Sequence, residues 1–298
     1  MKHRLLIILA IALVGEAFSQ STQNAERLKV SYMVVAHRGD WRNHPENSLP
    51  AIQSCIDKGY DVVEIDIQRT LDSVLVLSHD ETLDRTTNGH GRICDHTLAE
   101  LQQLRLKAGH GACTTRNRIP TLEEVLILCK GKILINIDKG WDYFDQVCDL
   151  LEKTGTTGQV IIKSRVSLER LQREHPTILS RVIYMPIANI DWDESTAFVD
   201  AWVLKYNNEA ESGPAAFEVD FASVNDNVLR NLKVLREAGI PIWMNALWPS
   251  QNAAHDDDRA VELHEPDESW GWLLAQGATI IQTDRPAELK QYLLQFKN

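Results

Sequence analysis

The strongest constraint on the fold is a regular alternation of two kinds of segment. Eight short runs rich in aliphatic and β-branched residues recur along the chain, at 33–36, 62–67, 132–138, 160–163, 181–185, 216–221, 241–245 and 278–283. Segments with helical spacing of apolar residues separate them, at 48–58, 121–129, 143–153, 168–174, 194–206, 227–238 and 269–276, and a last one at 287–296 closes the chain. Eight strand–helix units without a low-complexity linker predict an α/β fold, a single (β/α)8 TIM barrel rather than a doubly wound sheet.

Two stretches are longer than a minimal barrel needs. The first, 72–118, follows the second strand and contains a short extra strand at 74–77 and the turn signal Asn88-Gly89. The second, 248–268, follows the seventh strand and is long, polar and acidic. Because both follow a strand, we expect them to rise from the face on which TIM barrels build their active sites. The fold prediction is therefore a TIM barrel with a small excursion after strand two.

The amino terminus has the pattern of a cleavable signal peptide over residues 1–19. A basic tripeptide precedes an apolar run at 5–14, and small residues follow at Ala17 and Ser19. The apolar run is about half the roughly 20 residues that a membrane-spanning helix needs, although an uncleaved anchor remains the alternative. We therefore expect an exported protein, periplasmic or secreted, with a mature domain over 20–298 and no stable membrane insertion.

Charge and cysteine content narrow the class of protein. The net charge of −11 argues against a general affinity for nucleic acid or an anionic membrane surface. All five cysteines lie beyond the leader, and none has the spacing of a CxxC or metal-binding motif. Cys94 and Cys113 flank the excursion and are the candidates for a disulfide in an oxidising compartment. The other three lie in apolar helical patterns and are expected to be buried thiols.

Three carboxylates are expected to converge inside the barrel. The alternation of the second strand puts Glu64 and Asp66 on its inner face, and the run 132–138 puts Asp138 there together with Asn136. Three carboxylates near the carboxyl ends of adjacent strands cannot all stay ionised in a confined space without a cation. Oxygen ligands favour Ca²⁺ or Mg²⁺ over zinc. The alternative is that these polar strand faces simply meet water.

Two histidines and an arginine are placed to act at the same site. His37 follows the first strand directly, and His79 follows the extra strand. Histidine exchanges protons near neutral pH, and cleavage of a phosphodiester needs a base for the nucleophile and an acid for the leaving oxygen. Arg38 offers a planar guanidinium fork for a phosphate. The alternatives are structural histidines held by hydrogen bonds and an ordinary surface ion pair for Arg38.

These residues belong to an ordered series of short motifs. In chain order the motifs are Ala36-His37-Arg38-Gly39, Pro45-Glu46-Asn47-Ser48, Glu64-Ile65-Asp66, Ser78-His79-Asp80, Leu83-Asp84-Arg85-Thr86-Thr87, Thr121-Leu122-Glu123-Glu124, the segment from Trp243 to Asn245, and Thr283-Asp284-Arg285-Pro286. The series resembles the signature blocks of the glycerophosphodiester phosphodiesterase family, of the PLC-like TIM-barrel superfamily, over nearly the whole mature chain. The resemblance implies that Glu64 and Asp66 bind the metal ion and that Arg38 grips the phosphate. It also makes His37 and His79 the acid and the base, without assigning which is which.

The chain departs from the family pattern at the third metal ligand. The family has a pattern similar to Asn-Ile-Glu-x-Lys, whereas this chain has Asn136-Ile137-Asp138-Lys139-Gly140. Asp138 suits the ligand role with a shorter side chain, as in the related sphingomyelinase D group. Lys139 is displaced by one residue and is expected to face outward from the strand. Lys163, at the end of the fourth strand, is the candidate to supply the missing positive charge to the phosphate.

The activity that the resemblance implies is metal-dependent hydrolysis of glycerophosphodiesters to glycerol 3-phosphate and an alcohol. Water or a hydroxyl of the substrate is the nucleophile. A phospholipase C/D-like lipid phosphodiesterase on the same barrel is one alternative, and it predicts an apolar collar at the barrel mouth. The candidates for that collar are Trp192, Trp248, Trp270 and Trp272. A non-catalytic binding protein is the other alternative, but it expects a missing histidine or ligand, and this chain has both histidines and all three carboxylates.

The acidic stretch after the seventh strand has two interpretations. Asp256, Asp257 and Asp258 could receive a cationic head group such as choline, with Trp248 offering a cation–π face. Alternatively, the stretch is a solvated surface loop.

Overall fold

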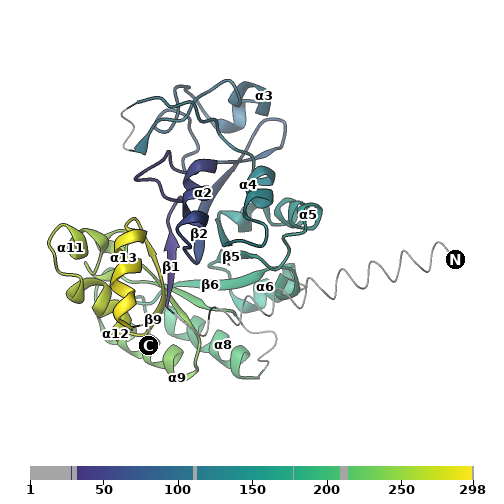
Figure 1. Cartoon of the computed structure of the whole chain (residues 1–298). Coiled ribbons are helices and arrows are strands. Elements are labelled where there is room, and N and C mark those ends of the chain that lie inside the picture. Colours follow the sequence, from purple (N-terminus) through teal and green to yellow (C-terminus); the bar gives the residue numbers. More distant parts are fainter. Residues whose placement is uncertain (1–27, 29–31, 110–112, 177, 209–213, 297–298) are drawn as a thin grey trace.

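Eight parallel strands close into a barrel among the residues that the computed structural model describes, which are 28, 32–109, 113–176, 178–208 and 214–296. In spatial order the strands are β1 (Met33–Ala36), β2 (Val62–Arg69), β4 (Leu134–Asp138), β5 (Val160–Ser164), β6 (Ile183–Asn189), β7 (Phe217–Asp220), β8 (Ile242–Asn245) and β9 (Ala278–Thr283). Because β1 pairs in parallel with both β2 and β9, the sheet is closed. The predicted TIM barrel is confirmed, and each predicted strand overlaps one barrel strand (Figure 1).

Helices between the strands cover the outside of the barrel (Figure 1). They are α2 (Leu49–Asp57), α4 (Leu122–Cys129), α5 (Phe144–Thr154), α6 (Leu168–Glu174), α7 (Ile178–Arg181), α8 (Ser195–Asn208), α9 (Asp226–Glu237), α12 (Trp272–Ala275) and α13 (Pro286–Leu293), with short 3₁₀ turns η3 (Gly140–Tyr143) and η5 (Leu294–Phe296). Local sequence sets where several of them begin. Thr121 starts α4 with a capping box, in which Thr121 and Glu124 each accept a hydrogen bond from the other's backbone N–H. Ser48 caps α2 by accepting from the N–H of Ala51.

Strand alternation divides the core into two layers. The apolar cluster inside the barrel includes Met33, Val35, Val62, Leu134, Ile161, Ile183, Met185, Ala216, Trp243 and Ile280. A larger cluster lies between the strands and the helices and includes Val63, Ile65 and Ile67 of β2. The intervening positions of β2 therefore point into the barrel, which places Glu64 and Asp66 inside it as predicted.

The excursion after β2 folds as a small lobe with its own core. β3 (Leu75–Leu77) pairs antiparallel with β2, and η1 (Ile93–Asp95) and α3 (Leu98–Leu101) follow. The buried apolar side chains of this core are Val76, Leu83, Ile93, Leu101, Leu106 and Ile119. Figure 1 shows the lobe, marked by α3, projecting from the barrel beyond α2 and α4. His79 lies two residues after the end of β3, so the root of the lobe carries this residue.

The predicted disulfide between Cys94 and Cys113 is wrong, because all five cysteines are free. Cys94 is exposed in η1, where its thiol contacts Asp95 Oδ1 at 3.7 Å. Cys113 is exposed in a different part of the lobe, where its carbonyl accepts from the N–H of Ala108. The other three cysteines are buried thiols, as predicted. Apolar packing and hydrogen bonds, rather than a cross-link, therefore stabilise the lobe.

The stretch 248–268, predicted to be a polar loop, is folded. It forms α10 (Pro249–Asn252) and α11 (Asp257–Val261) and runs into a short π-helical turn, η4 (Asp267–Gly271). Asp256 is buried and caps α11 by accepting from the N–H of Arg259 at 3.0 Å. Asp257 is buried as well. These two carboxylates are committed to the fold, so neither of them is a solvated loop residue or available to a cationic head group, the two interpretations that the sequence left open.

The predicted signal peptide, residues 1–19, lies outside the described residues. Within the described ranges, no helix is both long enough and apolar enough to cross a membrane. The barrel strands run from Met33 to Thr283 and lie inside the predicted domain at 20–298.

Candidate active site

The turn after β1 aims its backbone at the barrel carboxylates. Arg38 has a φ of 52° and Gly39 a φ of 77°. The left-handed conformation is unfavourable for arginine, so the surrounding contacts must hold it, and the N–H of Arg38 donates to Glu64 Oε2 at 2.8 Å. Only glycine fits the next position, because a Cβ on Gly39 would lie 2.9 Å from the Cβ of Ala51. The His37-Arg38-Gly39 motif therefore sets the direction of two candidate catalytic side chains.

Glu64 and Asp66, which are buried, form a carboxylate triad with the half-buried Asp138 toward the carboxyl ends of β2 and β4. Asp66 lies opposite Asp138 in the register of the two strands, and one oxygen from each of the three carboxylates lies within 4.8 Å of the others. Burial, together with the charges of Asp66 and Asp138, raises the pKa of Glu64 well above its ordinary value. The donors are all oxygens at a spacing that one cation can bridge. The triad therefore fits a divalent metal ion, as predicted.

The segment after the β1 turn holds the triad from outside the barrel. Asn47 Nδ2 donates to Asp66 Oδ2 at 2.8 Å, and Asn47 Oδ1 accepts from the N–H of Asp66 at 3.0 Å. The N–H of Asn47 donates to the carbonyl of Arg38 at 3.0 Å. Glu46 Oε1 accepts from a terminal nitrogen of Arg38 at 3.3 Å. Glu46 and Asn47 therefore tie the guanidinium and one triad carboxylate to the same short segment.

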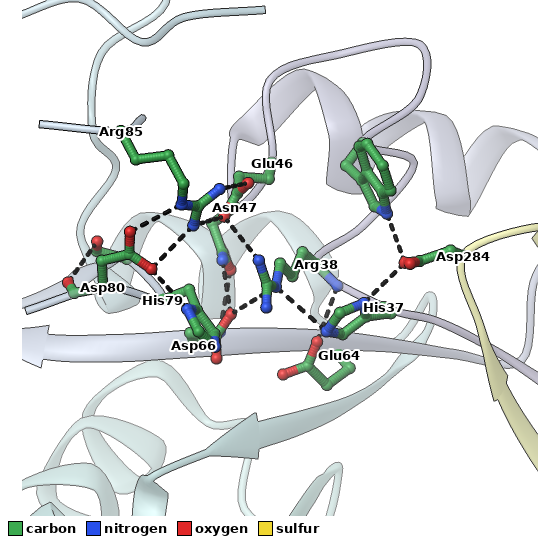
Figure 2. A network of polar contacts seen from close by, with 12 residues as sticks. His37, Arg38, Glu46, Asn47, Glu64, Asp66, His79, Asp80, Arg85 and Asp284 are labelled. Atoms are coloured by element: carbon green, nitrogen blue, oxygen red, sulfur yellow. Dashed lines mark hydrogen bonds and ion pairs between the residues drawn. The ribbon is translucent and has the colours of Figure 1, made fainter. Parts of the chain in front are cut away.

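His37 is held by a carboxylate from the other end of the chain. Its Nδ1 lies 2.7 Å from Asp284 Oδ1, and Arg38 Nε donates to its Nε2 at 3.2 Å (Figure 2). Trp41 Nε1 also donates to Asp284 Oδ1, at 2.6 Å. Burial by itself raises the pKa of Asp284, but the hydrogen bonds from His37 and Trp41 outweigh it and hold that pKa below its ordinary value. Asp284 therefore remains a carboxylate that accepts from Nδ1, so proton transfer falls to Nε2 of His37, which must first exchange its contact with Arg38 Nε for one with the substrate.

A second carboxylate, Asp257, fixes Asp284 from behind. Asp257 is 2% exposed and accepts from the N–H of Asp284 at 2.6 Å. It also accepts from Thr283 Oγ1 at 2.7 Å and from Trp270 Nε1 at 2.9 Å. Burial raises the pKa of Asp257 to about 7. Asp257 belongs to the stretch 248–268 after β8. Through it, this stretch holds Asp284, the hydrogen-bond partner of His37.

The predicted apolar collar is present only in part among the described residues. Trp248 is 46% exposed, and its ring meets His37 edge-on with 5.6 Å between centroids. Trp192 is exposed as well. Trp270 is buried, and Trp272 packs against the core between strands and helices. Two of the four candidates are therefore packing residues, and Trp248 is the one that contacts a candidate catalytic side chain.

His79 is held by its own neighbour at the root of the lobe. Its Nδ1 lies 2.7 Å from Asp80 Oδ1. Arg85 donates to Asp80 Oδ2 at 2.7 Å and to Glu46 Oε2 at 2.5 Å, and Figure 2 shows it spanning these two carboxylates. Arg85 lowers the pKa of Asp80 well below its ordinary value, partial burial opposes this, and His79 adds to the lowering. His79 therefore also has its Nδ1 on a charged carboxylate.

Lys139 does not face outward, which corrects the sequence prediction. β4 ends at Asp138, and Lys139 has a left-handed φ of 61°, so strand alternation no longer governs its direction. Its Nζ donates to the backbone carbonyl of His79, which also accepts from Gln68 Nε2 at 3.3 Å. Lys139 thus supports the segment that carries His79.

Lys163 points into the barrel beside the triad. Its Nζ lies 2.7 Å from Glu218 Oε2 and 4.9 Å from the ring centroid of Trp243. Burial alone lowers the pKa of Lys163, but Glu218, Asp138 and Glu64 raise it above its ordinary value. Lys163 is therefore a buried, charged ammonium next to the candidate metal site, where the predicted phosphate contact requires it.

The sequence prediction assigns no role to the carboxylates that hold the two histidines or Lys163. Asp80 and Asp284 stand inside the motifs that carry the family resemblance, so the motifs themselves were an available signal. Glu218 was signalled by the alternation of β7, which turns it to the same side as Asp220. Asp257 had no signal of its own, because an aspartate in an acidic run looks like a surface residue until its burial is known.

A closed parallel barrel with two carboxylate-bound histidines and an acidic triad defines a TIM-barrel protein with a candidate metal and acid–base site. Within that class, the model of the glycerophosphoryl diester phosphodiesterase family matches residues 37–288. The chain belongs to this family.

Individual relatives agree with that assignment. The glycerophosphodiester phosphodiesterase of Caldanaerobacter subterraneus subsp. tengcongensis is 46% identical over 107 residues, which is 36% of this chain and 44% of that protein. The chain thus spans less than half the length of this curated relative. A crystal structure of a glycerophosphoryl diester phosphodiesterase from Parabacteroides distasonis superposes with a TM-score of 0.68 at 24% identity, covering 91% of this chain and 88% of that one. An Oleispira antarctica phosphodiesterase in complex with the product sn-glycerol-3-phosphate has a TM-score of 0.60 at 20% identity, covering 89% and 97%. At these identities the two structures confirm the fold.

Proposed function

We propose that this protein hydrolyses glycerophosphodiesters to glycerol 3-phosphate and an alcohol. The observation that carries the proposal is a pair of histidines, each with its Nδ1 on a carboxylate, in one polar network with Arg38 and with Glu64 and Asp66 of the triad (Figure 2). Membership of the family supports the same reaction. So does the similarity in fold to the Oleispira antarctica phosphodiesterase whose structure holds sn-glycerol-3-phosphate.

Protein groups supply proton transfer and positive charge in this reaction. With Nδ1 of each imidazole bound to its carboxylate, Nε2 is the atom that exchanges a proton with the substrate. One histidine accepts the proton of the nucleophile, and the other delivers a proton to the departing alcohol oxygen. Arg38 and Lys163 neutralise the phosphoryl oxygens as charge develops on them.

We assign the carboxylate triad to a divalent cation, Ca²⁺ or Mg²⁺, because its donors are all oxygens. When bound, such an ion supplies a positive charge to a phosphoryl oxygen. The protein orients two of the three ligands in advance. Asn47 holds Asp66, and the N–H of Arg38 holds Glu64.

The proposal is tested by assaying release of glycerol 3-phosphate from glycerophosphocholine by the purified protein. Excess chelator should abolish release, because the triad then presents uncompensated negative charge to an anionic substrate. Adding back Ca²⁺ or Mg²⁺ separately identifies the ion. Full activity in chelator would contradict the metal assignment. Failure to cleave any glycerophosphodiester in the presence of either ion would contradict the function.

One observation favours a second candidate substrate, a lysophospholipid. Trp248 offers exposed apolar surface directly beside His37, where an acyl chain could lie. An assay of choline release, run with lysophosphatidylcholine and with glycerophosphocholine, decides between the two. Faster cleavage of the lipid than of glycerophosphocholine would replace the proposed function with this one.

We also propose that the protein is exported, on the strength of the leader pattern in residues 1–19. Amino-terminal sequencing of protein recovered outside the cytoplasm should begin at Gln20. An intact amino terminus in the cytoplasmic fraction would contradict export.

A further inference from the structure

Two neighbouring residues at the end of β9 hold His37 in place. The carbonyl of Thr283 accepts from the backbone N–H of His37 at 3.2 Å, and Asp284 Oδ1 lies 2.7 Å from its Nδ1. The first contact fixes the backbone of His37, and the second fixes the direction and the tautomer of its ring. Whatever holds Thr283 and Asp284 therefore controls where Nε2 of His37 points.

Asp257 contacts both of these residues and ties them to the neighbouring strand. Its carboxyl group accepts from Thr283 Oγ1 at 2.7 Å and from the N–H of Asp284 at 2.6 Å. Its own N–H donates to the carbonyl of Ala246, directly after β8, at 2.7 Å. β8 and β9 are paired in the barrel. Asp257 is thus a hydrogen-bonded bridge between the ends of these two strands.

The contacts of Asp257 serve the residues that hold His37. Its third donor is Trp270 Nε1 of η4, at 2.9 Å. Asp257, Thr283 and Trp270 are each at most 2% exposed, so water has little room to replace any of them. Burying a carboxyl group is costly, and an apolar side chain would fill the same space at a lower cost. Two of the three donors belong to Thr283 and Asp284, which gives this buried carboxyl group a purpose beyond packing.

We propose that Asp257 is a positioning residue for catalysis, which acts on His37 through Asp284. The inference rests on the proposed function, because it gives Asp257 a share of kcat in that reaction. Within the described part of the chain, the hydrogen bonds of Asp257 reach neither His37 nor the triad, so its effect passes through the end of β9. A misplacement of the imidazole by about 1 Å is enough to slow proton transfer.

The first test is Asp257→Asn, assayed with glycerophosphocholine and a divalent cation. An amide cannot accept from all three donors, because its NH2 group faces one of them in either orientation. We expect kcat to fall about 10-fold and KM to change less than about 2-fold, since the groups proposed to bind the phosphate are unchanged. Asp258→Asn, the same substitution at the next and exposed residue, is the matched control and should keep the wild-type kcat.

Ser269→Ala separates positioning from a general loosening of the stretch 248–268. Ser269 is buried, and its Oγ donates to the carbonyl of Asp256 at 2.6 Å, which ties the start of α11 to η4. This variant should lower the melting temperature and keep the wild-type kcat. If it lowers kcat as much as Asp257→Asn does at an equal loss of melting temperature, Asp257 only stabilises the stretch and the inference is overturned.

A double-mutant cycle with Asp284→Ala tests the route from Asp257 to His37. Once the carboxylate of Asp284 is gone, Asp257 has no side chain left to aim at the imidazole. In that background Asp257→Asn should therefore lower kcat by less than about 2-fold, whereas residues that act independently have losses that multiply. A full 10-fold loss in the Asp284→Ala background would overturn the inference.

The imidazole nitrogens give a readout that does not depend on turnover. Their NMR chemical shifts differ between the two tautomers, because the protonated and unprotonated nitrogens are distinct. In Asp257→Asn the nitrogen shifts of His37 should move toward the average of the two tautomers. Those of His79 should stay unchanged, because its Nδ1 is held by Asp80 at the root of the lobe.

Trp270→Phe keeps the test valid if Asp257→Asn fails to fold. It removes one donor to Asp257 and keeps an aromatic ring in the core. It should lower kcat about 3-fold, in keeping with the loss of one neutral hydrogen bond, and move the His37 shifts in the same direction.

The outcomes separate this role from the activity. If kcat and the His37 shifts keep their wild-type values in the folded variants, the positioning role is overturned while the proposed function stands. If wild type cleaves no glycerophosphodiester with a divalent cation present, the proposed function falls and the share of kcat falls with it. The His37 shifts then still decide whether Asp257 holds the imidazole.

Discussion

The two histidine–carboxylate pairs have the same local geometry in different surroundings. In both, an imidazole Nδ1 lies 2.7 Å from an aspartate oxygen. The His37–Asp284 side chains are 8% and 16% exposed, whereas the His79–Asp80 side chains are 39% and 27% exposed. The first pair joins the ends of β1 and β9, which are neighbours in the barrel. The second pair lies at the root of the lobe and uses adjacent residues.

The difference shows that one arrangement can be stabilised in two ways. The buried pair is held by the barrel itself. Asp257 accepts from the N–H of Asp284, and Trp41 Nε1 donates to the carboxylate of Asp284. The exposed pair depends on Arg85, which crosses to Glu46 near the surface. Water can take the place of a lost partner in the exposed pair but has little room to do so in the buried one. We therefore expect the His37 pair to be less tolerant of change.

The largest expected effect is the loss of either imidazole. His37→Ala and His79→Ala should each lower kcat by about 10²-fold or more, as expected for removal of a general acid or base. Added imidazole should restore more activity to His79→Ala, because that position is open to solvent. His90→Ala removes an exposed histidine of the same lobe and should leave kcat near the wild-type value. If added imidazole restored more activity to His37→Ala than to His79→Ala, solvent exposure would not be what distinguishes the two pairs.

A loss no larger than this is expected when the carboxylates are changed and the histidines are kept. Asp284→Asn should lower kcat by about 10²-fold and Asp80→Asn by about 10-fold, because an asparagine amide no longer fixes the tautomer and only the exposed pair can recruit water. The measurement is kcat for glycerophosphocholine across pH, with the melting temperature of each variant as a check on folding. Equal losses in the two variants would show that burial does not distinguish the pairs.

The smallest expected effect is on stability and comes from Asp257. The pKa of this carboxyl is raised to about 7 by burial, compared with about 3.9 in an unfolded chain. The folded protein therefore keeps the proton over a range in which the unfolded chain has released it, and the stabilisation present below about pH 4 is lost as the pH rises to about 7. Asp257→Asn does not titrate. The free energy of unfolding of wild type minus that of the variant should thus fall between pH 4 and pH 7 in urea titrations. A constant difference would mean that Asp257 is charged in the folded protein throughout.

The sequence by itself determined the barrel and the direction of the triad. Eight alternating strand and helix patterns were enough for the architecture, because each pattern reflects local backbone geometry. The two-residue period of a strand placed Glu64, Asp66 and Asp138 inside the barrel without any knowledge of their neighbours. Short motifs in a fixed order were enough for the family, although they left the partner of each histidine unassigned.

Only the tertiary structure decided which groups hold those residues. Asp284 reaches His37 across 247 positions of sequence, and it does so because closure of the barrel sets β9 beside β1. A solvated loop was one of the two interpretations of 248–268, yet Asp257 is buried there against Trp270 and Thr283. Lys139 donates to the carbonyl of His79 because β4 ends at Asp138, so Lys139 no longer follows the alternation of the strand. Burial and long-range pairing depend on the packing of the whole chain, so no local pattern of residues specifies them.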